Sequence, residues 1–225
     1  KNVSFLIYFK SINTNEIDLK KANLQIDYRQ YKNEINMEDK TVYAGLVGVG
    51  LNTYWAQFPG LYERLCGYQK QIAKQLEQEH VCIVDGGMVG EPEIVNELRR
   101  KSIDVLLVYI STYALSSTVL PLVQRLKIPV LLLNIQPTSC IDYAYLNSLG
   151  DRGLMTGEWL ANCQACSIPE VSNVFNRSGI HYEIITGYWD EAYVWTELRE
   201  WLEAAVAKKG MQNNRMGVLG HYYGG

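Results

Sequence analysis

The amino-acid sequence predicts an α/β protein, with a parallel-sheet, Rossmann-like (flavodoxin-like) three-layer domain followed by the start of a second α/β domain. Two observations support this prediction. From residue 41 onward, short runs rich in β-branched residues alternate with amphipathic runs of helical length, a pattern that is typical of parallel strands joined by helices. The chain also has 225 residues, of which 48% are hydrophobic, enough for one full domain and part of another.

The strands of this sheet are expected to be short, apolar and bounded by turn residues. In chain order they fall at residues 42–49, 80–84, 104–110, 129–135 and 181–186. The second strand is expected to end at Asp85-Gly86-Gly87, a sequence suited to a turn. A sixth strand at 215–219 would open the second domain, and since the chain stops soon afterwards, at Gly225, we expect it to be a truncated piece.

The helices between these strands are expected where apolar residues recur every three or four positions. In chain order they fall at residues 60–78, 91–102, 117–126, 153–165, after Pro169, and at 190–207. In the last of them, Val194, Leu198 and Leu202 belong to one apolar stripe that would face a core. A loop, residues 50–59, is expected between the first strand and the first helix.

The first 36 residues differ in composition from the rest, because they contain none of the 18 glycines and none of the 6 prolines. Residues 1–36 are therefore interpreted as an atypical or non-native N-terminal segment, expected to be poorly packed, ahead of a domain at 37–210 and the strand-bearing piece at 211–225. Two explanations stay open. The segment is either upstream sequence read through in frame before Met37, or a genuine extension with a strand at residues 3–9.

Charge and hydropathy exclude several classes of protein. The formal net charge of -3 and the lack of a basic stripe give no surface for nucleic acid. The longest apolar runs, such as residues 105–110, are far shorter than the roughly 20 residues of a membrane-spanning helix. Nor does the N-terminus have the core and cleavage site of a signal peptide. We therefore expect a cytoplasmic protein that binds neither nucleic acid nor membrane.

The 5 cysteines are expected to be reduced thiols, since they are too few for a disulfide framework in a chain of this length. Cys163-x-x-Cys166 has the spacing of a redox motif or half of a zinc site. It lies in a segment expected to be helical, with no second pair and no neighbouring histidine. We interpret it as two packed thiols.

Ligand contacts are expected at the carboxyl ends of the strands, where loops converge in a parallel sheet. Amides, hydroxyls and aromatic rings predominate there: Leu51, Asn52, Thr53, Tyr54 and Trp55; Ser111 and Tyr113; Asn134 and Gln136; Tyr188 and Trp189. Such a mixture suits a polyhydroxylated ligand, whose hydroxyls need donors and acceptors and whose C–H faces stack on rings. The alternative is that the aromatic residues only cover the end of the sheet.

A dinucleotide site is a weaker possibility. Gly48-x-Gly50 follows the first strand, but Thr53 stands where the third glycine of the fingerprint is expected. Asp85 lies at the end of the second strand, where a dinucleotide-binding domain has the carboxylate that binds the ribose. In the fingerprint that carboxylate lies about 20 residues after the glycines, whereas Asp85 lies about 35 residues after Gly50. The three histidines have no triad or metal-site spacing with carboxylates, so no catalytic residue and no metal ligand is assigned in this chain.

Four segments, in order along the chain, resemble the L-arabinose isomerase / L-fucose isomerase-like family of sugar isomerases. Residues 45–55 read GLVGVGLNTYW, similar to the family's first strand and sugar-contacting loop. Residues 105–136 read VLLVYISTYALSSTVLPLVQRLKIPVLLLNIQ, similar to two family strands and the helix between them. Residues 184–190 read IITGYWD, and residues 215–225 read RMGVLGHYYGG, similar to the strand that opens the family's second domain.

The resemblance implies the N-terminal domain of a cytoplasmic aldose–ketose isomerase that uses Mn2+ held by glutamates and histidines of later domains. It also implies a homo-oligomer, a trimer or hexamer. Sugar contacts carried over by position are Tyr54, Tyr113 and Gln136, with Leu51 and Thr53 in the same loop as Tyr54. Leu51, Ser111 and Asn134 depart from the family pattern, which leaves the substrate open between a pentose and a deoxyhexose.

Two other classes of function stay open. A sugar-binding sensor of the periplasmic-binding type would have an export signal or a DNA-binding head before the domain, and residues 1–36 resemble neither. An NAD-dependent oxidoreductase would bind the nicotinamide cofactor at the first strand. Binding measurements separate these classes from the isomerase domain.

Overall fold

The computed structural model describes residues 41–89, 98 and 100–212. Within it, Thr41–Val206 form one compact unit. The features expected at residues 1–36, most of the helix expected at 91–102, and the strand expected at 215–219 lie outside the described residues. Met211 and Gln212 end a long helix, and the domain boundary expected at residue 210 stays a prediction.

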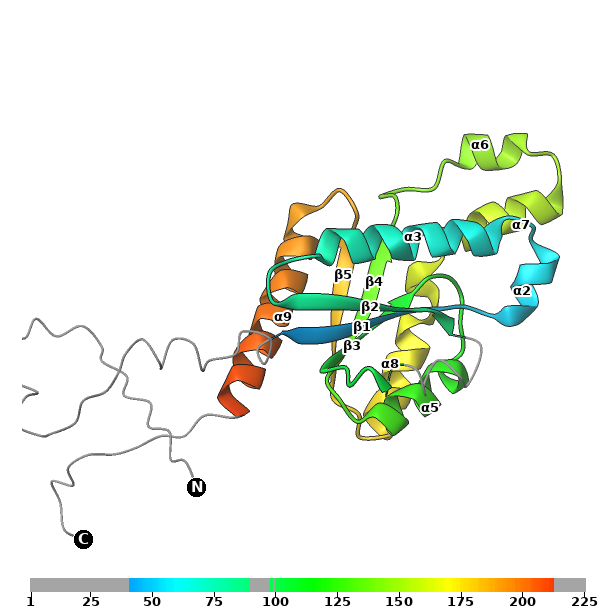
Figure 1. Cartoon of the computed structure of the whole chain (residues 1–225). Helices are drawn as coiled ribbons and strands as arrows, with labels where there is room; N and C mark the ends of the chain where they lie inside the picture. The colour runs from blue at the N-terminus through cyan, green and yellow to red at the C-terminus, as the bar shows by residue number, and fades with distance from the viewer. Residues whose placement is uncertain (1–40, 90–97, 99, 213–225) are drawn as a thin grey trace, which may run out of the picture. The chain divides into compact units, whose positions relative to one another are not determined.

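A five-stranded parallel sheet forms the centre of the compact unit (Figure 1). The strands are β1 (Val42–Val49), β2 (Val81–Val89), β3 (Val105–Ile110), β4 (Val130–Gln136) and β5 (Tyr182–Tyr188). Their spatial order is β2-β1-β3-β4-β5, and each neighbouring pair is parallel. This is the flavodoxin-like order of doubly wound sheets, so the predicted fold class is confirmed.

Helices cover both faces of the sheet and give it three layers (Figure 1). On one face, α3 (Leu61–Leu76) and α9 (Ala192–Gln212) bury residues such as Ile72 and Leu198 against the strands. On the other, α5 (Ser116–Leu126) and α8 (Ile168–Arg177) bury residues such as Leu122 and Phe175. None of the helices in the described residues is both long and apolar enough to cross a membrane.

The prediction that β2 ends at Asp85-Gly86-Gly87 is wrong, because the strand continues to Val89. The register passes from Leu46 opposite Asp85 to Gly48 opposite Met88, so Gly86 and Gly87 together face Val47. This is a β-bulge. Gly87 takes a φ of 68°, a conformation that favours glycine, and a side chain on Gly86 would meet Val47 at 2.8 Å. The glycines therefore bend the strand without ending it.

Two connections also differ from their predictions. The loop expected at residues 50–59 contains a short helix, α2 (Asn52–Gln57). The single helix expected at 153–165 is divided into α7 (Arg152–Leu160) and a 3-10 helix, η3 (Gln164–Ser167), and α6 (Tyr143–Ser148) precedes them. These short elements lie beyond the carboxyl ends of the strands (Figure 1). They therefore decide which side chains meet at the edge where ligands bind in this class of fold.

The expectation that Cys163 and Cys166 are reduced thiols is wrong, since a disulfide joins them with their Cα atoms 5.5 Å apart. Cys163 directly precedes η3, and Cys166 lies within it. In a 3-10 helix, side chains three positions apart are eclipsed, and the distance between the Cα atoms lies within the usual range for a disulfide. Cys66, Cys82 and Cys140 are free, as expected.

Candidate functional site at the carboxyl edge of the sheet

The residues predicted to contact a sugar near β1 lie on or beside helix α2. Leu51 caps its N-terminus, and Thr53 and Tyr54 lie in its first turn, with Thr53 exposed and Tyr54 half-buried. Tyr113 follows β3 and is 38% exposed. Burial raises the pKa of Tyr54, and the phenol of Tyr113 lies close enough to raise it further. The structure thus brings Tyr54 and Tyr113 near each other.

Gln136, the third predicted contact, is the last residue of β4. Its carbonyl oxygen accepts a hydrogen bond from the backbone N–H of Trp189 at 3.1 Å. Because β3 lies between β1 and β4, Gln136 stands two strands away from the strand that leads to Tyr54. That these residues contact one sugar stays a prediction.

Trp55 lies against the end of β1, where the connections that follow β1 and β3 turn in opposite directions. A side chain on Gly50 would lie only 2.6 Å from the ring of Trp55 and 3.0 Å from the methyl group of Thr112. The indole N–H of Trp55 donates to the side-chain oxygen of Asn52 at 3.2 Å, and the ring packs edge-on against Tyr62. Glycine at position 50 therefore makes room for the indole ring.

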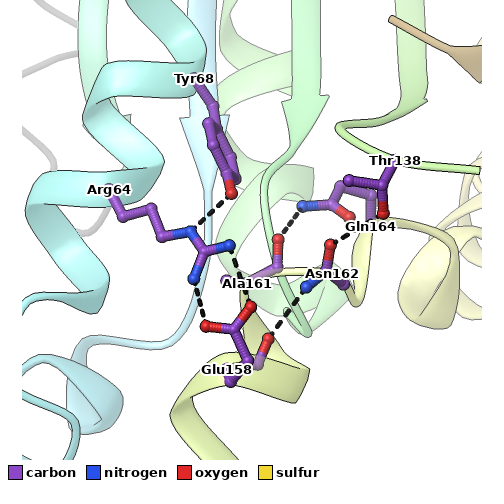
Figure 2. Close-up of polar contacts among 7 residues, drawn as sticks. All are labelled: Arg64, Tyr68, Thr138, Glu158, Ala161, Asn162 and Gln164. Atoms are coloured by element: carbon purple, nitrogen blue, oxygen red, sulfur yellow. Dashed lines mark hydrogen bonds and ion pairs between the residues drawn. The ribbon is translucent and has the colours of Figure 1, made fainter. Parts of the chain in front are cut away.

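A polar cluster that the sequence did not predict lies nearby, between α3 and α7 (Figure 2). The guanidinium of Arg64 donates to both carboxylate oxygens of Glu158, at 2.5 and 3.1 Å. Its Nε donates to the hydroxyl of Tyr68 at 2.6 Å, and the guanidinium carbon lies 5.6 Å from the centre of the Tyr68 ring. Arg64 therefore joins the two helices at this edge of the sheet.

The side chain of Gln164 fastens the adjoining segment to the end of β3. Its amide nitrogen donates to the carbonyl oxygens of Ser111 and Ala161, at 2.9 and 2.8 Å. Next to it, the amide of Asn162 donates to the backbone oxygen of Glu158 at 3.0 Å, and the hydroxyl of Thr138 lies 3.4 Å from its side-chain oxygen (Figure 2). Each of these contacts involves Asn162 or Gln164, just before or at the start of η3.

Tyr109 and Trp189 complete the group. The rings of Tyr68 and Trp189 pack edge to face with their centres 4.9 Å apart. The phenol of Tyr68 and the amide of Gln164 both lie near the hydroxyl of Tyr109 and affect its pKa. We call the group defined by these contacts the edge cluster; it consists of Arg64, Tyr68, Tyr109, Glu158, Gln164 and Trp189.

Three atoms of the edge cluster are buried without a hydrogen-bond partner: the hydroxyl of Tyr109, Oε1 of Gln164 and the indole N–H of Trp189. Gln164 lies close enough to influence Tyr109, but no hydrogen bond of normal geometry joins them. Buried polar groups nearly always have a partner in the protein, in water or in a ligand. The indole N–H is a donor, the amide oxygen is an acceptor and the hydroxyl is both, so each can form a further hydrogen bond.

Charge at the edge cluster is fixed at neutral pH. Hydrogen bonding to Glu158 is the main cause that raises the pKa of Arg64, so its guanidinium stays protonated. Burial raises the pKa of Tyr109 well above its usual range, the nearby Tyr68 adds to the effect, and Gln164 acts in the opposite direction. Tyr109 therefore presents a neutral hydroxyl, and the charge of Arg64 is balanced by one carboxylate.

Mn2+ needs several carboxylate or imidazole ligands that converge on one point. Among residues 41–89, 98 and 100–212, no group of three His, Cys, Asp or Glu side chains could hold a metal ion. The unpartnered polar groups of the edge cluster are an amide oxygen, a phenol and an indole N–H, which suit hydroxyls better than a divalent cation. The residues that the structure describes thus do not fit the metal.

Sequence signals for the edge cluster were few. Arg64 and Tyr68 are four residues apart on one helix, a spacing that brings side chains together. Glu158 lies 94 residues from Arg64, and no local pattern connects the two. The only sequence signal for Tyr109 is its hydroxyl, a polar group within the apolar run of β3.

Comparison with models of known protein families gives no match for this chain. Comparison with curated protein sequences gives no match either.

Proposed function

We propose that this domain binds a sugar at the edge cluster, and that it serves as the N-terminal domain of an aldose–ketose isomerase of the L-arabinose/L-fucose type. The observation that carries the proposal is the set of three unpartnered buried polar atoms on Tyr109, Gln164 and Trp189. One of them, the indole N–H, belongs to the ring of Trp189, which packs edge to face on Tyr68. The four resembling segments supply the isomerase part of the proposal.

A sugar suits this arrangement because each of its hydroxyls both donates and accepts hydrogen bonds. The indole N–H of Trp189 needs an acceptor, and Oε1 of Gln164 needs a donor. The C–H face of a pyranose or of an opened pentose packs on aromatic rings such as Tyr68. A pentose or a deoxyhexose is the proposed substrate class, and the half-buried Tyr54 with its neighbour Tyr113 would contact its far end.

The proposal assigns binding, and no bond-making step, to the described residues. In an isomerase of this type a metal polarises the carbonyl and hydroxyl oxygens of the opened sugar, and Mn2+ with its ligands would come from other domains of a cytoplasmic homo-oligomer. Neighbouring subunits of a trimer or hexamer would place those domains over the edge of the sheet. The domain's own task is to hold and orient the sugar.

Two contacts favour a sugar over a dinucleotide. Trp55 lies against Gly50, where a pyrophosphate would have to approach the backbone. Oδ1 of Asp85, the candidate ribose ligand, accepts hydrogen bonds from the amide of Gln69 at 2.5 Å and the backbone N–H of Gly87 at 2.8 Å. The carboxylate therefore stabilises the bulge in β2.

The proposal is tested by calorimetric titration of the 225-residue chain with L-arabinose, L-fucose, D-arabinose and, as a rival ligand, NAD. We expect one of the sugars to bind. Replacing Trp189→Phe keeps a ring but removes the N–H, so the affinity should fall roughly tenfold, the effect of one hydrogen bond. The control Trp201→Phe changes a tryptophan that is 39% exposed on α9, and it should leave the affinity unchanged. Binding of NAD alone, or equal losses in the two variants, contradicts the proposal.

A further inference from the structure

The Cys163–Cys166 disulfide is unequally accessible at its two ends. Cys163 is 2% exposed, whereas Cys166 belongs to the exposed residues. A thiolate attacks a disulfide along the line of the two sulfur atoms, so access to one sulfur is enough for exchange. An attacking thiolate can therefore reach the sulfur of Cys166, and the sulfur of the buried Cys163 is then the leaving group.

Stabilising the fold explains this disulfide poorly. The two cysteines are only 3 positions apart, and in the chain-entropy account a cross-link that closes so short a loop constrains the unfolded chain least. In the reducing cytoplasm, where the proposed function places the protein, disulfides that do occur are usually transient and act in catalysis or redox sensing. The role of the disulfide is therefore indicated by its location in the fold and not by its contribution to stability.

The disulfide spans the segment that holds the β3–α5 loop in place. Gln164, between the two cysteines, donates to the carbonyl oxygen of Ser111 at 2.9 Å. Ser167, directly after Cys166, accepts a hydrogen bond on Oγ from the backbone N–H of Ala114 at 2.7 Å. Both side chains are almost completely buried. The first and last residues of the loop 111–114 are therefore fastened to η3, and Tyr113 lies between them.

We propose that Cys163 and Cys166 form a reversible thiol–disulfide exchange site for a dithiol reductant, and that its redox state sets the order of the loop 111–114. In the oxidised chain, the disulfide holds η3 in the one conformation that presents both Gln164 and Ser167. Reduction removes the covalent constraint, and the two hydrogen bonds to the loop are left to hold η3 alone.

The exchange is balanced in atoms and electrons. One thiolate of the dithiol forms a bond to the sulfur of Cys166, and the Cys163–Cys166 bond breaks with its electron pair on the sulfur of Cys163, which takes up a proton. The second thiolate of the reductant then attacks the reductant sulfur that is bonded to Cys166 in the mixed disulfide. This releases the thiolate of Cys166, which is protonated in turn. The protein gains two electrons and two protons, and the dithiol becomes a cyclic disulfide.

The chemistry is tested by equilibrating the folded chain with mixtures of reduced and oxidised dithiothreitol, followed by acid quenching, unfolding, alkylation and peptide mapping. We expect Cys163 and Cys166 to change from disulfide to alkylated thiols together, while far-UV circular dichroism stays native. The free thiols of Cys66, Cys82 and Cys140 are alkylated at every ratio and serve as internal standards. A pair that is reduced in every mixture, or that is reduced only when the chain unfolds, overturns the proposal.

The coupling is tested by amide hydrogen exchange measured by NMR. The Ala114 amide should exchange at least roughly tenfold faster in the reduced chain, the effect of losing one hydrogen bond, while Leu132 in the centre of β4 stays protected. Cys166→Ser should match the reduced chain without any reductant, and Cys140→Ser, which changes an exposed thiol elsewhere, should match the oxidised one. Equal exchange at Ala114 in both redox states contradicts the coupling. Neither readout uses a sugar, so this result is separate from the outcome of the sugar titration.

Discussion

Arg64 on α3 and Glu158 on α7 form a two-pronged ion pair, with nitrogen–oxygen distances of 2.5 and 3.1 Å. The pair connects segments 94 positions apart in the sequence. Its two side chains are 39% and 20% exposed, so water screens much of the attraction. It joins α3 to α7 at the carboxyl edge of the sheet.

Replacing Glu158→Gln should therefore lower the free energy of unfolding by no more than about 1 kcal/mol. A double-mutant cycle with Arg64→Met, measured by urea denaturation, isolates the energy of the pair. Glu203→Gln, a change at an exposed carboxylate on α9, serves as the control and should have almost no effect. A coupling energy of zero in the cycle would mean that the pair does not hold the two helices together.

Gly50 should not tolerate a side chain. In Gly50→Ala the new methyl group would lie 2.6 Å from the ring of Trp55, so we expect a loss of about 1–3 kcal/mol from overpacking. Thermal denaturation measures it. Gly67→Ala is the matched control, because the new methyl group meets nothing within 4 Å in the interior of α3 and should raise stability by up to about 1 kcal/mol. Trp55→Leu in the Gly50→Ala background should recover part of the loss, and no recovery would show that Trp55 is not the obstacle.

The sequence was a good guide to the sheet and a poor guide to its carboxyl edge. β1, β3 and β4 are buried runs with no competing helical pattern, and the structure places them within a residue or two of the prediction. The glycines at 86 and 87 have two uses, a turn and a bulge, and only pairing with β1 decides between them. Local composition does not contain that information.

The edge cluster could not be predicted for a related reason. Glu158 and Gln164 reach Arg64 and Ser111 because α7 and η3 fold back over the sheet, and short helices of this kind have weak periodicity. The helix predicted across 153–165 contained Cys163 and ended one residue before Cys166. The change to a 3-10 helix at Gln164 aligns them for a disulfide. In each case a tertiary contact overrides a local preference.

Tyr109→Phe separates stability from binding. The hydroxyl of Tyr109 is buried without a partner, so in the absence of ligand its removal should leave stability unchanged or raise it by up to about 1 kcal/mol. Sugar affinity should fall, because the ligand loses a hydrogen bond. Tyr182→Phe is the control, since its hydroxyl lies 3.2 Å from both the carbonyl oxygen of Ser172 and the side chain of Asn176, and it should destabilise the fold. A clear loss of stability in Tyr109→Phe would mean that water already satisfies the hydroxyl.

The purified 225-residue chain is expected to give no turnover of L-arabinose, L-fucose or D-arabinose with added Mn2+. Isomerisation by the proposed chemistry needs a metal on the sugar oxygens and a carboxylate that moves the proton. Within the part of the chain that the structure describes, no three side chains are grouped to hold a metal. A colorimetric ketose assay, with metal-free buffer as the blank, measures the outcome. Metal-dependent turnover would place the chemistry within this chain and would contradict the division of labour proposed above.

Alkaline titration should reveal the buried Tyr109. Burial raises its pKa above the ordinary value of 10.0, so its neutral form favours the folded state. The contribution of this raised pKa to the free energy of unfolding is fully present below the pKa that Tyr109 has in the unfolded chain. As the pH rises past about 10, the phenol ionises in the unfolded chain while it stays protonated in the folded chain, so stability falls until the folded pKa is passed.

The free energy of unfolding of the native sequence should therefore decline above pH 10, and that of Tyr109→Phe should decline less steeply. Urea denaturation at a series of alkaline pH values measures both slopes. Tyr54 also has a raised pKa, caused by burial and by Tyr113, so Tyr54→Phe should show a smaller effect of the same sign because its side chain is only half-buried. Parallel declines in the native sequence and in Tyr109→Phe would show that the phenol at position 109 can ionise in the folded protein as readily as in the unfolded chain.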